Sequence, residues 1–372
     1  MLIDWNWLVE RLKGKDISGW FGNATGGTYL QKFQADFANY CNVKNGIACS
    51  SGSASIYVAL RACGVGEGDS VAVPAYTHIG SVAPIVLAGA KPLFIDSDKY
   101  GNLSPSDLEK AIKGVRNLRA VIAVHLLGVP CEMQEIKNVV DDYPGKVFIV
   151  EDASHALGSE YRGKRCGALG DVGCFSIGGG RTKTIGTGEG GIIVTEDDIL
   201  ADRCRNIRNH GDRYTDVDYL CFNFRMSELN AAVGLSQMSK LDMLIDWQIE
   251  KAEYLLNKLP KFLSVPEPQA NVKSTRYLLG CVYRGERFTR DEFVSRLIEM
   301  LNKKRIENGV PRRNVSKGQT KSIDQVRFYQ KFKRPCPFAH SLISNSFWID
   351  WHRYPRTEEE IDELIETMKE IV

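Results

Sequence analysis

Short, almost entirely apolar runs recur through the first half of the chain and alternate with helical patterns. Such runs lie at residues 71–74, 92–95, 120–125 and 147–150, and an amphipathic pattern at 105–113 separates the second run from the third. Runs of this length and composition are typical of strands buried on both faces of a parallel sheet. Their alternation with helices indicates βαβ units, so we expect an α/β fold with a mostly parallel central sheet flanked by helices.

The pattern changes after about residue 245. Helical periodicity covers 247–259 and 288–304, a strand-like run lies at 277–283, and a turn region bounded by prolines lies at 260–268. We therefore expect a large domain at residues 1–245 and a smaller C-terminal α+β domain at residues 246–372. An amphipathic helix is expected at residues 4–13, and the sequence leaves open whether it packs on the smaller domain.

Composition is that of an ordinary globular protein and argues against several other classes. The 372 residues carry a formal net charge of +2, whereas nucleic-acid-binding domains are usually clearly basic, so we expect no nucleic acid partner. Ten cysteines are scattered without a CxxC pair or a Cys/His ligand spacing, so we expect neither a metal site nor a disulfide framework. No apolar span approaches the roughly 20 residues that cross a bilayer, and the N-terminus lacks the apolar core of a signal peptide. We expect a cytoplasmic protein without a membrane partner.

The candidate chemistry lies in residues 147–191. The apolar run 147–150 ends in Glu151-Asp152, which places a carboxylate at the carboxyl end of a strand, where open α/β sheets bind their ligands. Farther along, Lys183 lies on a glycine-rich loop between two strand-like pieces. Pyridoxal phosphate needs a lysine amine to hold its aldehyde as a Schiff base, and a carboxylate to keep its pyridine nitrogen protonated. Taken singly, each residue is better explained as a surface lysine or a helix-capping aspartate, and only the combination favours the cofactor.

The same stretch resembles the DegT/StrS-type sugar aminotransferase family. Members have a strand that ends in EDAA followed by Gln or His, a G-C-F-S-F strand, and a Schiff-base lysine six residues before the glutamate of E-G-G; this chain has EDASH, GCFSI and Lys183 six residues before Glu189. The chain carries two more residues between Ser176 and the lysine than the family usually has, so a count forward from Ser176 reaches Arg181 instead. We prefer Lys183 because arginine stays protonated and cannot form the imine. The resemblance implies the fold type I of pyridoxal-phosphate-dependent transferases, with Lys183 and Asp152 as catalytic residues.

Further cofactor contacts follow from the resemblance. The strand–turn–helix at 47–63 places Gly52 and Ser53 at a helix start, where free N–H groups and the helix dipole favour an anion. The family binds the cofactor phosphate at the matching S-G-T, although serine capping of the helix is an alternative. Ser176 is also implied as a phosphate contact. His78 occupies the position of an aromatic residue that stacks on the pyridine ring, and its alternative is a solvent-facing loop histidine.

Two more residues are implied to reach the cofactor. His155, three residues after Asp152, would contact the ring hydroxyl. Asn223 matches the asparagine of a family motif that reaches the phosphate in the neighbouring subunit, which implies a homodimer with active sites at the subunit interface. Ser227 and Glu228 precede an apolar-periodic pattern and indicate the start of a helix.

Several readings of the function remain open. We expect an enzyme that moves an amino group from glutamate or glutamine to a keto sugar, with nucleotide-linked sugars preferred, in amino-sugar biosynthesis. A cyclitol or an antibiotic-precursor ketone is an alternative substrate, and a non-catalytic pyridoxal-phosphate-binding regulator is an alternative of another class. Residues 186–191 satisfy GxGxxG, but an apolar strand follows them where a dinucleotide site needs a helix, so we expect a glycine-rich hairpin. The basic run at 303–334 is either a solvated surface or a contact for a phosphorylated substrate.

Overall fold

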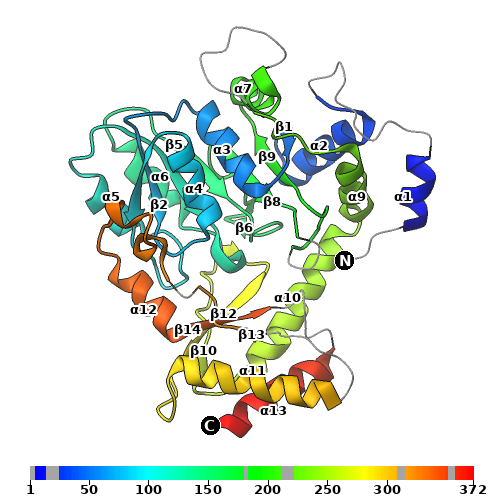
Figure 1. Cartoon of the computed structure of the whole chain (residues 1–372), viewed down its shortest axis with the longest axis vertical. Helices are drawn as coiled ribbons and strands as arrows, with labels where there is room; N and C mark the ends of the chain where they lie inside the picture. The colour runs from blue at the N-terminus through cyan, green and yellow to red at the C-terminus, as the bar shows by residue number, and fades with distance from the viewer. Residues whose placement is uncertain are drawn as a thin grey trace.

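The computed structural model describes residues 5–13, 25–179, 183–211, 222–307, 315–319, 321–350 and 357–372. Its centre is a seven-stranded sheet with the order β1-β9-β8-β5-β4-β2-β3 (Figure 1). The strands are β1 (Asn45–Cys49), β2 (Ser70–Pro74), β3 (Lys91–Ile95), β4 (Leu118–Val124), β5 (Phe148–Asp152), β8 (Val172–Ser176) and β9 (Gly191–Thr195). Strand β9 runs antiparallel to β1 and β8, and the other neighbouring pairs are parallel. The mostly parallel α/β sheet that the apolar runs predict is confirmed.

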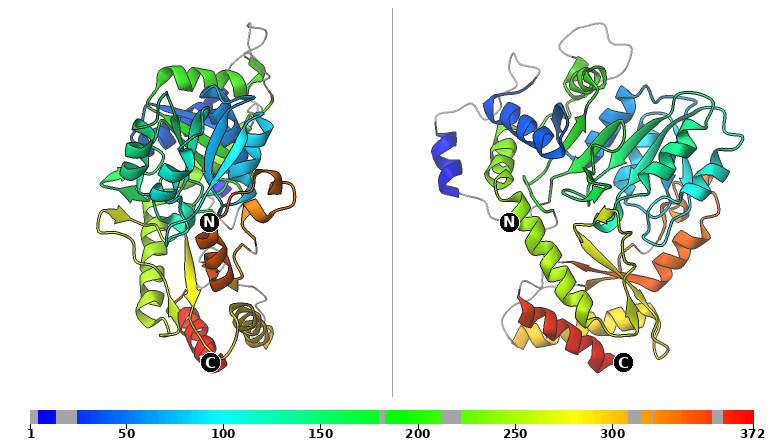
Figure 2. Two further views of the ribbon diagram at one scale, coloured as in Figure 1. Left: turned by 90° about the vertical axis from the view of Figure 1, so that its left-hand side faces the viewer. Right: turned by 180° about the vertical axis from the view of Figure 1, so that it is seen from behind.

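Helices cover both faces of this sheet, as Figure 2 shows. Successive residues of β4 alternate between the faces: Ala120 and Ile122 belong to one core, and Val121 and Ala123 belong to the other. The first face is covered by α3 (Gly52–Ala62), α4 (Ile79–Leu87) and α7 (Asp198–Arg208). The second face is covered by α2 (Thr28–Cys41), α5 (Pro105–Ile112), α6 (Met133–Asp141) and α9 (Glu228–Met238). Helix α1 (Trp5–Leu12) contacts α9.

A smaller antiparallel sheet lies below the first in Figure 1. Its strands, in the order β10-β12-β14-β13, are β10 (Leu263–Ser264), β12 (Leu278–Tyr283), β14 (Ser346–Asp350) and β13 (Val315–Ser316). It shares a core with α11 (Arg290–Glu307) and α13 (Glu358–Ile371). Helix α10 (Leu241–Lys258) joins the two parts, because Ile245 packs in the core of the large sheet and Leu255 in that of the small one. A three-stranded sheet of β11 (Val272–Lys273), β6 (Glu160–Tyr161) and β7 (Lys164–Arg165) adds a further connection.

One part of the C-terminal chain returns to the large sheet. We call residues 321–345 the linking segment; it contains η2 (Ile323–Gln325), η3 (Gln330–Phe332) and α12 (Pro337–Asn345). Its buried apolar side chains belong to the core of the large sheet: Ile323, Tyr329, Cys336, Ala339 and Ile343. The Arg334 guanidinium pairs with both oxygens of Asp107, at 2.5 and 2.8 Å. The domain division at residue 245 stays a prediction. The linking segment belongs to the predicted C-terminal domain by sequence but packs on the large sheet.

The start of α2 shows how distant residues fix a helix. Its N-cap is Gly27, which has no side chain to cap the helix. The Glu228 carboxylate from the first turn of α9 takes that role and accepts the N–H groups of Tyr29 at 2.8 Å and Leu30 at 3.1 Å. A Cβ on residue 27 would lie 2.7 Å from the Glu228 carboxyl carbon, so only glycine leaves room for this contact. The helix start predicted at Ser227 and Glu228 is present, with the Ser227 side chain accepting the Asn230 N–H at 3.2 Å.

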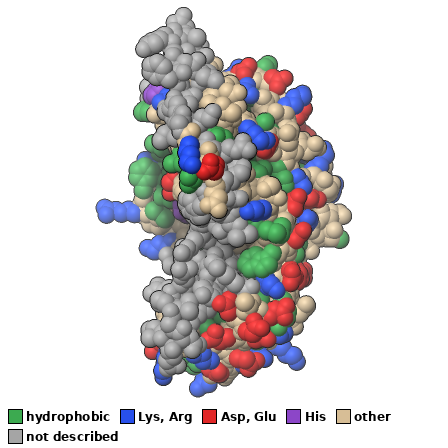
Figure 3. Space-filling model, turned by 90° about the vertical axis from the view of Figure 1, so that its right-hand side faces the viewer, with side chains coloured by type: hydrophobic (Ala, Val, Ile, Leu, Met, Phe, Trp, Pro, Cys, Tyr) green, Lys and Arg blue, Asp and Glu red, His purple; other side chains and the backbone are tan. Residues whose placement is uncertain are grey.

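The glycine-rich residues 186–191, the helices, the cysteines and the surface charges can be compared with the remaining predictions from the sequence. Residues 186–191 lead into β9, which pairs antiparallel with β8, so the expected glycine-rich hairpin is present in place of a strand–helix dinucleotide motif. Among the described helices, none combines the length and apolar character needed to cross a bilayer. Nine cysteines lie in the part of the chain that the structure describes, and all nine are free and buried. On the face in Figure 3, acidic and basic side chains are interspersed.

Candidate active site

A cavity of about 560 Å³ opens at the carboxyl edge of the large sheet. The parallel strands β2, β4, β5 and β8 end at this edge, and the N-terminus of α3 meets them there. Residues in or next to strands of the small sheet close the other side. The lining residues are Ser51, Gly52, Ser53, Ile56, Thr77, His78, Gly80, Ser81, Val124, Leu126, Asp152, Ser154, His155, Ser176, Lys183, Glu189, Tyr277, Gly318, Gln319 and Trp348. The structure therefore brings seven of the eight sequence-predicted site residues together in one cavity.

Asp152 lies at the last position of β5 with a buried carboxylate. The Ser81 hydroxyl donates to its Oδ2 at 2.6 Å, and the Ser154 N–H donates to its Oδ1 at 3.1 Å. The Thr77 hydroxyl lies 2.9 Å from that of Ser81 and extends the chain of polar contacts. A carboxylate has about four lone-pair sites, so two donors leave capacity for a third, such as a protonated ring nitrogen.

Lys183 reaches into the same cavity from the loop between β8 and β9. Its amine donates to the Ser154 carbonyl at 2.8 Å and lies 5.2 Å from the centre of the Tyr277 ring. Burial lowers the pKa of this amine from its ordinary value to about 8, while the nearby Asp152 carboxylate acts in the opposite direction. A larger share of the amine is therefore unprotonated near neutral pH, the form that attacks an aldehyde. Arg181, the alternative to Lys183, lies outside the described residues.

The first turn of α3 forms a cradle suited to an anion. The Ser51 side chain caps the helix and accepts the Ala54 N–H at 3.1 Å, while the N–H groups of Gly52 and Ser53 lie ahead of the helical hydrogen bonds at the cavity wall. Ser176, at the end of β8, approaches so closely that a Cβ on residue 52 would lie 2.6 Å from the Ser176 Cβ. N–H groups, two hydroxyls and the positive end of a helix fit a phosphate group. Ser51 thus performs the helix capping that the sequence offers as an alternative role for these serines, and Ser53 lines the cavity.

The three remaining predicted residues differ in their placement. His78 is exposed at the rim, and its Nδ1 accepts the Gly80 N–H at 3.0 Å as the N-cap of α4. His155 lines the cavity and stacks on Tyr277 with ring centres 4.4 Å apart. Asn223 is exposed outside the cavity, where it forms a β-bridge with Asn209. The roles of all three in cofactor binding stay predictions.

The lining residues that the sequence does not single out include Ser81, Tyr277, Gln319 and Trp348. Ser81 lies four residues after Thr77, on the first turn of a helix that follows a predicted strand, and this spacing could have indicated it. The other three come from the C-terminal third of the chain, and their local patterns give no sign of proximity to Asp152.

A buried polar cluster of His125, Glu151 and Cys166 lies next to the site and has residue types that can bind a metal. The Cys131 N–H donates to His125 Nδ1 at 3.0 Å, so Nε2 carries the ring proton and donates to Glu151 at 2.9 Å. Three backbone N–H groups of residues 167–170 also donate to the Glu151 carboxylate, at 2.6 to 2.7 Å. These bonds occupy both ring nitrogens of the histidine, so the cluster serves to hold the loop after Cys166 against β5.

Comparisons with known proteins agree with this geometry. The model of the DegT/DnrJ/EryC1/StrS aminotransferase family matches residues 9–369. A GDP-perosamine synthase of Escherichia coli O157:H7 is 36% identical over 262 residues, which cover 69% of this chain and 70% of that protein. A pleiotropic regulatory protein of Geobacillus stearothermophilus is 39% identical over 221 residues, 58% of this chain and 57% of its own.

Solved structures extend the likeness over almost the whole chain. DesV of S. venezuelae has a TM-score of 0.84 and 28% identity, with 98% of this chain and 93% of DesV covered. A DegT DnrJ EryC1 StrS aminotransferase from Brucella abortus has a TM-score of 0.85 and 25% identity, with 98% and 94% covered. A cavity with a lysine amine, a strand-end carboxylate and an anion cradle is what pyridoxal phosphate requires. The chain belongs to the DegT/DnrJ/EryC1/StrS aminotransferase family, and it is an aminotransferase with pyridoxal 5′-phosphate as its cofactor.

Proposed function

We propose that this aminotransferase moves an amino group from glutamate or glutamine to the ketone of a nucleotide-linked keto sugar. The observation that carries the proposal is the common cavity of Lys183, Asp152 and the α3 cradle. Support for the substrate class comes from relatives that are named for GDP-, dTDP- and UDP-linked sugars. Nucleotide-linked sugars are therefore a better candidate than a cyclitol or another antibiotic-precursor ketone.

Five of the residues that line the cavity would take part directly in this reaction. Pyridoxal phosphate supplies an aldehyde that carries the amino group and a ring that withdraws electrons from the reacting carbon. Gly52, Ser53 and Ser176 would bind its phosphate, and Asp152 would keep the proton on its ring nitrogen. Burial lowers the pKa of the Lys183 amine to about 8. Near neutral pH this amine can therefore take a proton from the reacting carbon and later donate it back.

Two half-reactions test the assignment. Purified protein is loaded with pyridoxal phosphate, and its absorption spectrum is followed after addition of glutamate or glutamine. The amino donor should convert the cofactor to its aminated form, and a nucleotide-linked keto sugar should convert it back with release of an amino sugar detected by mass spectrometry. Lys183→Ala is the control, which should bind the cofactor without turnover. A protein that takes up no pyridoxal phosphate contradicts the proposal.

A non-catalytic regulator, the alternative of another class, disagrees with membership of an aminotransferase family, although one relative is named a pleiotropic regulatory protein. The cavity contains both Lys183 and Asp152, and a regulator that only senses the cofactor needs no proton-transferring amine. The glutamate half-reaction separates the two, because a regulator would bind pyridoxal phosphate but leave the donor unchanged.

We also propose that the protein acts as a homodimer in the cytoplasm, with Asn223 reaching the site of the neighbouring subunit. The exposure of Asn223 outside its own cavity and the buried free cysteines support this. Inactive Lys183→Ala and impaired Asn223→Ala subunits should restore about a quarter of full activity when mixed, since half of the dimers would contain one intact site. No restoration would contradict the shared site.

A further inference from the structure

Tyr277 is a cavity residue with an unusual origin. It directly precedes β12 of the small sheet, yet its ring stacks on that of His155, in the turn after β5 of the large sheet, with 4.4 Å between the centres and 19° between the planes. Its side chain is only 5% exposed, and the Lys183 amine lies 5.2 Å from the centre of the ring. One aromatic side chain therefore contacts both the candidate Schiff-base lysine and a predicted cofactor ligand.

The tautomer of His155 is set by the chain around it. The Leu127 N–H donates to His155 Nδ1 at 3.4 Å, so this nitrogen accepts and Nε2 carries the proton. Leu127 adopts a left-handed conformation with φ of 57° inside the short turn η1 (Leu126–Gly128), which aims its N–H at the imidazole. A leucine in this region is strained, so the surrounding packing must hold it there.

The adjacent Gly128 is held in part by the segment that carries Tyr277. Ser274 donates its hydroxyl to the Gly128 carbonyl at 2.9 Å, and the Ser159 hydroxyl donates to the same carbonyl at 2.7 Å. Gln248 of α10 holds the Thr275 carbonyl, and a Cβ on residue 128 would lie 2.7 Å from the Tyr277 nitrogen. These buried contacts lock the Tyr277 backbone against the η1 turn.

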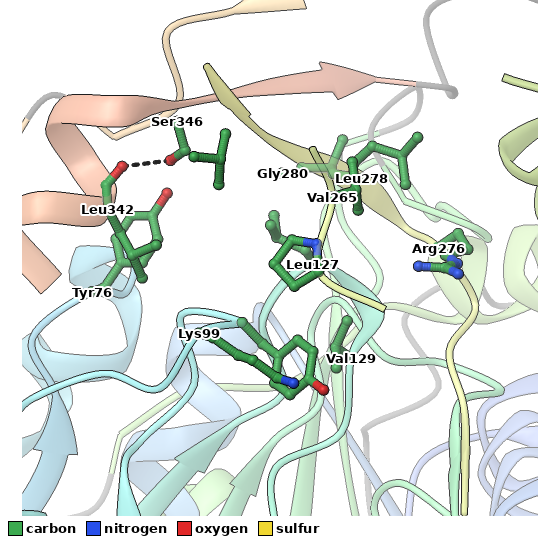
Figure 4. Close-up of a pocket in the computed structure, with 14 residues that line it drawn as sticks. Tyr76, Lys99, Leu127, Val129, Val265, Arg276, Leu278, Gly280, Leu342 and Ser346 are labelled. Carbon is green, nitrogen blue, oxygen red and sulfur yellow. Dashed lines mark hydrogen bonds between the residues drawn. The ribbon is translucent and has the colours of Figure 1, made fainter. Parts of the chain in front are cut away.

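Figure 4 shows the other side of the same junction. Leu127, Val129, Val265 and Leu278 line an apolar cavity of about 40 Å³ between the turn and the small sheet. This cavity is too small for a substrate, and it leaves the side chains next to Tyr277 without close packing on one side. The stack with His155 and the hydrogen-bonded backbone both contribute to the position of the Tyr277 ring.

We propose that Tyr277 is a positioning residue that holds the His155 imidazole in the orientation and tautomer in which Nε2–H can donate to the cofactor. The small sheet thereby takes part in cofactor binding without touching the phosphate or the ring nitrogen. This inference rests on the proposed role of His155 in the cofactor site.

The test compares three substitutions at one position. Tyr277→Phe and Tyr277→His keep a flat ring, whereas Tyr277→Leu fills space without one. The first measurement is the His155 tautomer in the cofactor-free protein. It is read from the ¹⁵N chemical shifts of labelled histidine side chains, and the His155 signals are identified by their absence in His155→Gln. The second is the dissociation constant of pyridoxal phosphate for each variant. Thermal unfolding confirms that each variant is folded, and the two flat-ring variants keep the test available should the leucine variant not fold.

The flat-ring variants should keep the Nε2–H tautomer and bind the cofactor as the unsubstituted chain does. Tyr277→Leu should give a mixture of tautomers and weaken cofactor binding by about two- to tenfold, the range of an aromatic pair. In a His155→Gln background, Tyr277→Leu should have no further effect. An unchanged tautomer in Tyr277→Leu, or an equal loss of affinity with and without His155, would overturn the proposal. Failure of the unsubstituted chain to bind pyridoxal phosphate would instead contradict the proposed function, since the tautomer is measured without cofactor.

Discussion

The Lys183 amine should behave as a reactive base near neutral pH, and Asp152 should control how reactive it is. Burial lowers its pKa from 10.5 to about 8. At pH 7 the unprotonated fraction is then roughly 10%, against roughly 0.03% for an amine of ordinary pKa, a difference of about 300-fold. The Asp152 carboxylate stabilises the protonated amine and raises the pKa, so Asp152→Asn should lower it further.

Reductive methylation of the cofactor-free protein measures this directly. The protein is treated with formaldehyde and cyanoborohydride at a series of pH values, and labelling of each lysine is followed by peptide mass spectrometry. Exposed lysines such as Lys91 and Lys113 serve as internal standards. The labelling midpoint of Lys183 should fall near pH 8 and move downward in Asp152→Asn. The exposed substitution Asp142→Asn, away from the cavity, is the matched control and should leave the midpoint unchanged.

Two results would refute this reasoning. A Lys183 midpoint in the range of the exposed lysines would mean that the amine is not desolvated. A midpoint that stays the same or rises in Asp152→Asn would mean that the carboxylate charge does not raise the pKa of the amine, which would also weaken the assignment of the two residues to one catalytic site.

Three further experiments test the cradle and the fold. Gly52→Ala should weaken pyridoxal phosphate binding about tenfold or more, because the new Cβ would lie 2.6 Å from that of Ser176, while binding of phosphate-free pyridoxal changes little. Glu228→Gln should lower the free energy of unfolding in urea by about 1–3 kcal/mol, because the amide has one acceptor oxygen for the two N–H groups at the start of α2 and carries no charge. Glu135→Gln, at an exposed first helical turn, should change this free energy by less than about 0.5 kcal/mol. A double-mutant cycle of Arg334→Ala and Asp107→Asn should give a coupling of about 1 kcal/mol, and additive effects would show that this pair is not coupled.

The sequence predicts the large sheet well because its strands are local signals. The runs at 71–74, 92–95, 120–125 and 147–150 all lie in or largely overlap parallel strands, and the carboxylate at the end of the last run lies in the cavity as expected. Lys183 was identified from a motif count despite two extra residues before it, and it shares the cavity with Asp152. Both features are encoded by short stretches of chain, and the role of Lys183 as the Schiff-base lysine stays a prediction.

Contacts between distant stretches could not be predicted in this way. Tyr277 belongs to an apolar strand pattern that gives no reason to place its ring on His155. The basic run at 303–334 gave no sign that Arg334 pairs with Asp107, nor that Ile323 and Tyr329 enter the core of the large sheet. Glu228 was identified as a local helix start, whereas its carboxylate also caps a helix about 200 positions earlier in the chain. Such roles arise from tertiary packing, which periodicity does not record.

The linking segment has a consequence for how the protein is made. Strand β3 stands at the end of the large sheet, and Phe94 on it is covered by Tyr329, with ring centres 6.5 Å apart. A ribosome produces this strand long before it reaches the residues that cover it. The nascent chain therefore exposes an open sheet edge and an uncovered aromatic side chain for most of its synthesis, and such edges pair readily with other chains. Protection of the newborn chain by chaperones should matter most during this interval, and release of a product truncated before residue 321 should lead to aggregation.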